Sequence, residues 1–148
     1  MTTSAPTERS TGPLAETALA FITTMSRLVS DHDTPDTDEY WSPLAAFVSV
    51  EEFRRQVPSD TFGGDWAGAM DWATYLAGFR TWRASKPRYH NAVTRIAELD
   101  DLVYLEIDEH HGDRVFRSLS TYQFNAEGKV IGVRVAAAAG RLTVLAGP

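Results

Sequence analysis

The first part of the chain carries apolar residues at helical spacing. Apolar side chains three or four residues apart run from residue 14 to residue 29, namely Leu14, Ala18, Phe21, Ile22, Met25, Leu28 and Val29. This stripe predicts an amphipathic helix over residues 14–30, with Pro13 at its first turn. The acidic stretch that follows predicts a short helix that starts near Thr37 and stops before Pro43.

A second helical stripe lies in the middle of the chain and is largely aromatic. Its members are Trp72, Tyr75, Leu76, Phe79 and Trp82. The stripe predicts a helix over residues 70–85. We expect most of its side chains to pack in the core and fewer of them to contact a ligand. Residues 46–57 fit either a strand or a helical turn, because the run is too short for its period to decide. Residues 59–68 are glycine-rich and predict a loop.

From residue 88 onward the apolar period changes to two. This alternation predicts strands over residues 88–98, 101–111, 114–125 and 129–138, joined by turns short enough for antiparallel hairpins. Helices followed by a meander indicate an α+β fold, in which the helices cover one face of a curved antiparallel sheet. Residues 1–12 are rich in Ser, Thr and Pro, so we expect a disordered tail before a single domain over residues 13–148.

Composition narrows the function classes. The chain has 148 residues, 43% of them hydrophobic, and a formal net charge of -6. The acidic balance argues against nucleic acid and anionic membranes as partners. Without cysteine there is no thiol nucleophile and no Cys-ligated metal centre. No phosphate-binding loop, dinucleotide fingerprint or nucleophile elbow occurs. The first 12 residues lack the apolar core of a signal or membrane span, so a cytoplasmic location is expected.

The strand over residues 114–125 carries the first candidate chemistry. Period two places Ser118, Ser120 and Tyr122 on one face, between Phe116 and Phe124. That face is either a solvated sheet surface or the wall of a pocket. In a pocket, these hydroxyls would hydrogen-bond to an oxygen that develops negative charge.

The neighbouring strand over residues 101–111 allows two registers, because a one-residue slip exchanges its faces. The first register points Tyr104, Glu106 and Asp108 toward the pocket, with Leu102 and His110. The second points Val103, Leu105 and Ile107 inward and leaves the carboxylates on a solvated outer face. Hydrophobicity favours the second register. His110 and His111 adjoin the turn, so we expect both to be solvent-exposed, and their opposite faces argue against a metal site.

Three short pieces of sequence add a family resemblance. They are Trp66-Ala67-Gly68 before the second long helix, Arg88-Tyr89-His90 at a strand start, and the hairpin Tyr122-x-Phe124-Asn125-x-x-Gly128-Lys129-Val130. In this order they resemble the SnoaL-like branch of the nuclear-transport-factor-two-like superfamily over about residues 14–138. The resemblance implies a cone of curved antiparallel sheet, an α+β barrel, wrapped around the N-terminal helices, with a mostly apolar pocket in its mouth.

The resemblance also implies site residues and partners. It points to His90 as a pocket histidine suited to proton transfer, and to Tyr40 and Trp41 as aromatic residues that close the pocket. By analogy with the ketosteroid isomerase of this superfamily, it favours the first register. It further implies a homodimer through the outer sheet face, and neither a metal nor an organic cofactor. The strand position where relatives carry a key Asp is Ser120 here, which cannot act as a carboxylic acid.

We therefore expect a cofactor-independent acid/base enzyme: a cyclase, isomerase, dehydratase or hydrolase of a small hydrophobic oxygenated metabolite such as a polyketide or terpenoid. The expected catalytic residues are His90, Glu106 and Asp108. The expected substrate-binding residues are Tyr40, Trp41, Trp66, Tyr104, Ser118, Ser120 and Tyr122. Because Ser120 replaces the relatives' Asp, the alternative is a non-catalytic small-molecule-binding or accessory dimeric protein of the same fold.

Overall fold

The structure is a computed structural model that describes residues 12–57 and 68–137. Its helices are α2 (Pro13–Ser30), α3 (Asp38–Ala45) and α4 (Trp72–Ala84). Its strands are β1 (Arg54–Val57), β2 (Gly68–Met70), β3 (Tyr89–Leu99), β4 (Leu102–His111), β5 (Arg114–Phe124) and β6 (Val130–Ala137). Of the expected tail, residues 1–11 lie outside the described residues, and Gly12 is the N-cap of α2. None of the described helices is both long and apolar enough to cross a membrane.

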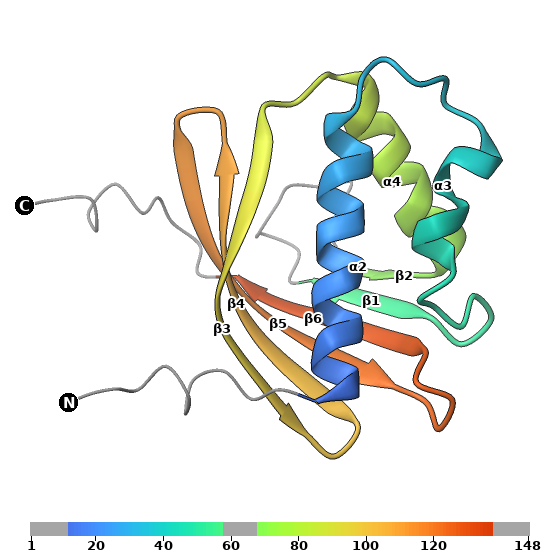
Figure 1. Ribbon diagram of the computed structural model, residues 1–148, viewed down its shortest axis with the longest axis vertical. Helices are drawn as coiled ribbons and strands as arrows, with labels where there is room; N and C mark the ends of the chain where they lie inside the picture. The colour runs from blue at the N-terminus through green and yellow to red at the C-terminus, as the bar shows by residue number, and fades with distance from the viewer. Residues whose placement is uncertain (1–11, 58–67, 138–148) are drawn as a thin grey trace, which may run out of the picture.

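The strands form one sheet in the order β2-β1-β6-β5-β4-β3. The run from β3 to β6 is an antiparallel meander whose strand ends lie within one residue of the predicted ones. Strand β1 joins β6 in parallel and β2 joins β1 antiparallel, so the sheet is mixed. The two end strands do not pair within the described residues, and the sheet is open where a closed barrel was expected. The α+β class is confirmed, with α2 lying across the sheet and α3 and α4 beside it (Figure 1).

Two helix ends differ from the prediction. Helix α3 continues through Pro43, where the sequence indicated a stop. Proline has no N–H to donate to the carbonyl of Glu39, and the hydroxyl of Ser42 donates to that oxygen instead, at 2.8 Å. Helix α4 begins at Trp72 because the carboxylate of Asp71 caps it by accepting from the backbone N–H of Thr74 at 2.9 Å.

Aromatic side chains fill the space between the helices and the sheet. Phe21 of α2 makes edge contacts with Phe47, Trp72 and Tyr122, with ring centroids 5.8–6.4 Å apart. Phe53 stacks on Tyr75, at 5.3 Å between centroids. These contacts tie α2, α4 and β5 into one core, so most of the predicted aromatic stripe of α4 is indeed buried.

A buried arginine fixes the segment that joins α2 to α3. Arg83 of α4 is 7% exposed and donates hydrogen bonds to the carbonyl oxygens of Asp31, at 2.6 Å, and Thr34. Its guanidinium lies 4.2 Å from the ring centroid of Tyr40. The hydroxyl of Tyr40 donates to the carbonyl of Leu28 at 2.6 Å. This network holds the segment between α2 and α3 against α4.

Candidate functional site

A cavity of about 220 Å³ lies between the helical layer and the sheet. Helices α2 and α4 supply an apolar and aromatic wall that includes Met25, Phe79 and Trp82, and the opposite wall is the inner face of β3 to β6. A cavity of about 150 Å³ accommodates benzene. The space is therefore large enough for a small organic molecule with a fused or substituted ring.

The sheet register places the polar residues of the cavity in order along its inner face. Directly paired residues of neighbouring strands share a face. Arg55 pairs with Val133, which pairs with Tyr122. Further along the strands, Ser120 pairs with Leu105 and Ser118 with Ile107. Glu109 then pairs with Asn91, and His111 pairs with Tyr89 at the end of the sheet.

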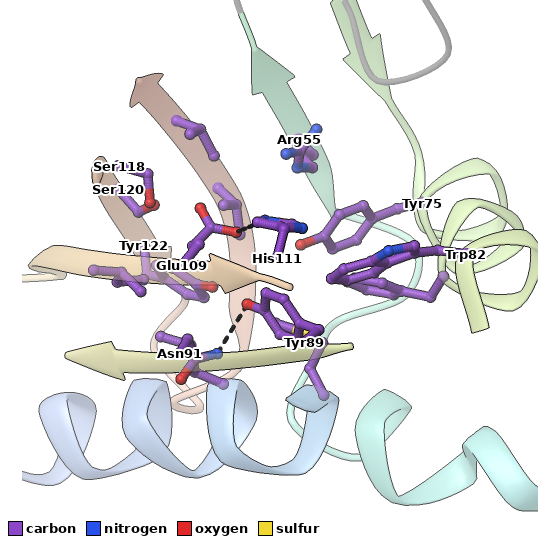
Figure 2. A pocket seen from close by; sticks show the side chains of 16 residues that line it. Arg55, Tyr75, Trp82, Tyr89, Asn91, Glu109, His111, Ser118, Ser120 and Tyr122 are labelled. Carbon is purple, nitrogen blue, oxygen red and sulfur yellow. Dashed lines mark hydrogen bonds and ion pairs between the residues drawn. The ribbon is translucent and has the colours of Figure 1, made fainter. Parts of the chain in front are cut away.

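Glu109 and His111 form the pair of titratable groups at one end of the cavity. The Nε2 atom of His111 lies 3.8 Å from Oε1 of Glu109, and the two side chains are 32% and 19% exposed. Figure 2 shows both side chains directed toward the interior. A carboxylate beside an imidazole orients the ring and supports proton transfer by it.

Aromatic rings surround His111. The ring centroids of Tyr89, Phe116 and Trp82 lie 5.1, 5.5 and 5.7 Å from that of the imidazole. The strand ends at His111. The next residue, Gly112, has a φ of +65° that suits a tight hairpin to β5, and its N–H donates to the carbonyl of Arg88 at 2.7 Å. The turn and the rings therefore hold the imidazole in one place.

Three tyrosines bring hydroxyl groups to the cavity. Burial raises the pKa of Tyr75 and the pKa of Tyr122, so both hydroxyls stay protonated at neutral pH. Burial also raises the pKa of Tyr89, and the charge of Glu109 adds to that effect. Tyr89 accepts a hydrogen bond from the amide of Asn91 at 3.0 Å (Figure 2). Protonated phenols are suited to donate to an oxygen of a bound molecule.

The residues expected on one face of β5 do line the cavity together. Ser118, Ser120 and Tyr122 are 1%, 6% and 4% exposed, and all three border the cavity. The pocket interpretation of this strand face is thus the one that the structure shows. The serines bring small hydroxyl groups to a wall that is otherwise aliphatic at Val135 and Ile107.

The register that the isomerase analogy favoured for β4 is wrong. Val103, Leu105 and Ile107 face inward and are at most 6% exposed, as the hydrophobicity argument indicated. Burying three aliphatic side chains outweighs any gain from turning carboxylates inward, because an ionised carboxylate loses its hydration there. Glu109 and His111 share the inward parity of Ile107.

The expected site residues Tyr104, Glu106 and Asp108 consequently lie on the outer face. Asp108 accepts two hydrogen bonds from Arg117, at 2.8 and 3.1 Å. Glu106 accepts from the hydroxyl of Thr94 at 2.8 Å, and Tyr104 is 43% exposed. These three side chains are therefore not placed to act on a molecule in the cavity.

His90 also lies outside the cavity, on the exposed outer face of β3. Its ring stacks on that of His110, with centroids 4.2 Å apart. The family resemblance, which placed His90 in the pocket, is wrong on this point. Val93 pairs with Ile107 and Arg95 with Glu106, so β3 contains a bulge with an extra residue, Thr94. The extra residue reverses the alternation, and His90 and Arg95 share the outer face despite their odd spacing.

The aromatic residues expected to close the pocket have other positions. Trp41 is fully buried, and its indole N–H donates to Asp36 at 2.8 Å. Tyr40 is held in the Arg83 network, and neither residue borders the cavity. Trp66 lies outside the described residues.

Sequence reasoning missed the residues that now carry the site. His111 was expected in solvent, Glu109 was not considered, and Arg55 lies in a segment left ambiguous. The parity of Ile107 would have placed Glu109 and His111 inside. Within residues 12–57 and 68–137, no group of three or more side chains of the metal-binding types comes together.

No protein-family model and no curated protein matches the sequence. Solved structures do match. A protein from Kribbella flavida with a proposed ketosteroid isomerase role superimposes with a TM-score of 0.63 at 14% identity, covering 86% of this chain and 79% of the other. A SnoaL-like protein of unknown function from Burkholderia thailandensis gives 0.63 at 14% identity, covering 87% and 97%.

A third match is IdmH from Streptomyces antibioticus, a proposed polyketide cyclase. It gives a TM-score of 0.61 at 13% identity, covering 90% of this chain and 96% of IdmH. At such identities the similarity establishes the fold and leaves the activity open. The chain therefore has the nuclear-transport-factor-two-like fold, and its structural matches include SnoaL-like proteins, as the sequence resemblance indicated.

Proposed function

We propose that the protein binds a small, largely apolar, oxygenated molecule in the cavity and transfers a proton on it, as an isomerase or cyclase does. In this proposal His111 removes a proton from the bound molecule, and Glu109 orients the imidazole and stabilises its protonated form. The electrons move toward an oxygen of the molecule, which accepts hydrogen bonds from Tyr122 and Ser120. His111 then returns the proton at another position, so the enzyme is unchanged after each cycle.

The observation that carries this proposal is the position of the Glu109–His111 pair. The two groups face a mostly apolar cavity, 3.8 Å apart, and the imidazole contacts three aromatic rings. In structures without substrate, catalytic hydrogen bonds are often long and tighten only in the complex with substrate, so a separation of 3.8 Å is compatible with this role. The proposed roles of the Kribbella flavida protein and of IdmH are both acid/base reactions, which supports the same class for this chain.

The alternative is a binding protein without turnover. It is favoured by Ser120, which gives the inner face of β5 a hydroxyl where catalytic relatives carry a carboxyl group. Both alternatives use the same cavity, so binding alone does not separate them.

The experiment is hydrogen–deuterium exchange at the carbon next to the carbonyl of bicyclic ketones such as 1-tetralone and 1-indanone, followed by NMR in D₂O. The acid/base proposal predicts exchange above the background rate. This exchange should be lost in the Glu109→Gln variant and also in the His111→Gln variant. Binding of the ketones with exchange at the background rate would instead favour the binding protein.

A further inference from the structure

Arg55 is a buried cation in the wall of the cavity. It is 6% exposed and lies on β1, a strand paired on both sides by β2 and β6. Its guanidinium carbon lies 5.1 Å from the ring centroid of Tyr75, which also borders the cavity. A charge held in a rigid, water-poor wall acts strongly on a bound group, because little solvent screens it.

The positive charge of Arg55 lies at one side of the cavity, close to two of its tyrosines. Burial has the largest effect on the pKa of Tyr75 and raises it. The positive charge of Arg55 has the next largest effect and lowers that pKa. The charge of Glu109 raises the pKa of Tyr75 by less. At Tyr122 the effect of Arg55 again exceeds that of Glu109. At Tyr89 the largest effect after burial is the negative charge of Glu109, which raises the pKa of that phenol further. Arg55 therefore places positive charge on the side of the cavity where Tyr75 and Tyr122 lie, and Glu109 places a carboxylate beside Tyr89 and Asn91.

From the position of the buried Arg55 in the cavity wall we infer that the cavity selects a molecule with an acidic oxygen, namely a carboxylate, a phenol or an enol, on an apolar body. Arg55 is the residue that determines this specificity. The inference rests on the cavity of the proposed function. The acidic oxygen lies on the side of Arg55 and Tyr122, and the rest of the molecule reaches toward Glu109 and His111.

The remaining wall residues fit such a ligand. Ile22, Met25 and Phe79 offer an apolar surface to its body. The hydroxyl of Tyr122 stays protonated and can donate to the same oxygen. A guanidinium has five N–H donors, so Arg55 can contact the protein and a ligand oxygen at once.

The same arrangement connects selectivity with chemistry. A positive charge favours the anionic form of an enol or a phenol, which is the form produced when a neighbouring proton is removed. Arg55 would then favour the product of proton removal as well as an anionic ligand. Its effect on binding can nevertheless be measured without turnover.

The test compares 2-naphthoate with its neutral counterpart 2-naphthamide by isothermal titration calorimetry at pH 7. The inference predicts that the wild-type protein binds the acid at least about tenfold more tightly than the amide, since one charge-assisted hydrogen bond supplies that much. Arg55→Met removes the charge at similar volume and should bring the ratio to about one. Arg55→Lys should keep part of the preference.

Several outcomes would overturn the inference. Equal affinities in the wild type, a preference for the amide, or an unchanged ratio in Arg55→Met would each exclude Arg55 as the selecting residue. Binding of neither compound would remove the cavity as a binding site and the proposed function with it. The wild-type ratio decides the question even if Arg55→Met does not fold. His111→Gln should keep the ratio of the two affinities. A failure of the proton-transfer proposal is therefore distinguishable from a failure of the inference about Arg55.

Discussion

Glu109 and His111 lie two residues apart on the inner face of β4, with 3.8 Å between Oε1 and Nε2. Two neighbours on β3, Asn91 and Tyr89, pair with them directly and also border the cavity. The acid/base pair is thus part of a continuous polar end of the sheet, and the strand register fixes its position. The predictions below test the cavity, the frame that supports it, and the pair itself.

Filling the cavity should weaken ligand binding without unfolding the protein. Ser120→Leu adds an apolar side chain that points into an open space of about 220 Å³. Thr121→Leu makes a comparable change on the outer face of the same strand. In titrations with 2-naphthoate or 2-naphthamide we expect Ser120→Leu to weaken binding at least about tenfold and Thr121→Leu to leave it unchanged. Equal effects of the two variants would show that the ligand binds elsewhere.

The Arg83 network should matter more to stability than an arginine one turn earlier on the same helix. Arg83→Met leaves the carbonyl groups of Asp31 and Thr34 without this donor and removes the contact with Tyr40. We expect a loss of about 2–4 kcal/mol in the free energy of unfolding by urea. Arg80→Met removes half-exposed ion pairs with Asp36 and Asp38 and should cost less than about 1 kcal/mol. The reverse order would contradict the network.

The cap of α4 should give a pH-dependent contribution to stability. Hydrogen bonds from Thr74 lower the pKa of Asp71 below its ordinary value of 3.8. A lowered pKa means that the contribution is complete above 3.8 and is lost as the pH falls through the folded-state value. The urea midpoint of the wild type should therefore exceed that of Asp71→Asn at pH 6 by more than at pH 3. A difference that does not change between these pH values would show that the charge of Asp71 has no part in the cap.

The outer sheet face is the surface on which we propose a homodimer. Tyr104 and Leu119 are 43% and 48% exposed on this face, next to the opposite charges of Asp108 and Arg117. Because a second copy would bury these apolar groups, Leu119→Glu should shift sedimentation from dimer to monomer. The control, Leu99→Glu at the exposed end of β3, should not change it. A wild type that sediments as a monomer would exclude this dimer.

Periodicity predicted the helices and the meander because both are set by which residues face the core. The helix stripes and the four long strands have the positions that the spacing of apolar residues indicates. The short strands β1 and β2 could not be predicted from the sequence, because runs of three or four residues carry too little periodic pattern. Strand β1 depends on pairing with β6, a contact that is distant in the sequence, and β2 depends in turn on pairing with β1.

The site was harder to predict because it depends on register and on one bulge. Ser118, Ser120 and Tyr122 were placed correctly, since their own strand alternates clearly. His90 was misplaced because the family resemblance carries no information on the bulge at Thr94, which sets the face of β3 on which each residue lies. Glu106 was misplaced because an analogy was given more weight than the inward aliphatics of β4. Arg55 was not predicted as a cavity residue, because it lies on β1 and the sequence does not reveal how that strand pairs.

The most direct test of the account compares His111→Gln with His90→Gln in the ketone exchange assay. Both substitutions remove an imidazole near the same end of the sheet, one from the cavity and one from the outer face. We predict that His111→Gln lowers the catalysed exchange rate at least about a hundredfold and that His90→Gln leaves it within about twofold of wild type. An unchanged rate in His111→Gln, or an equal loss in both variants, would contradict the assignment of proton transfer to the Glu109–His111 pair.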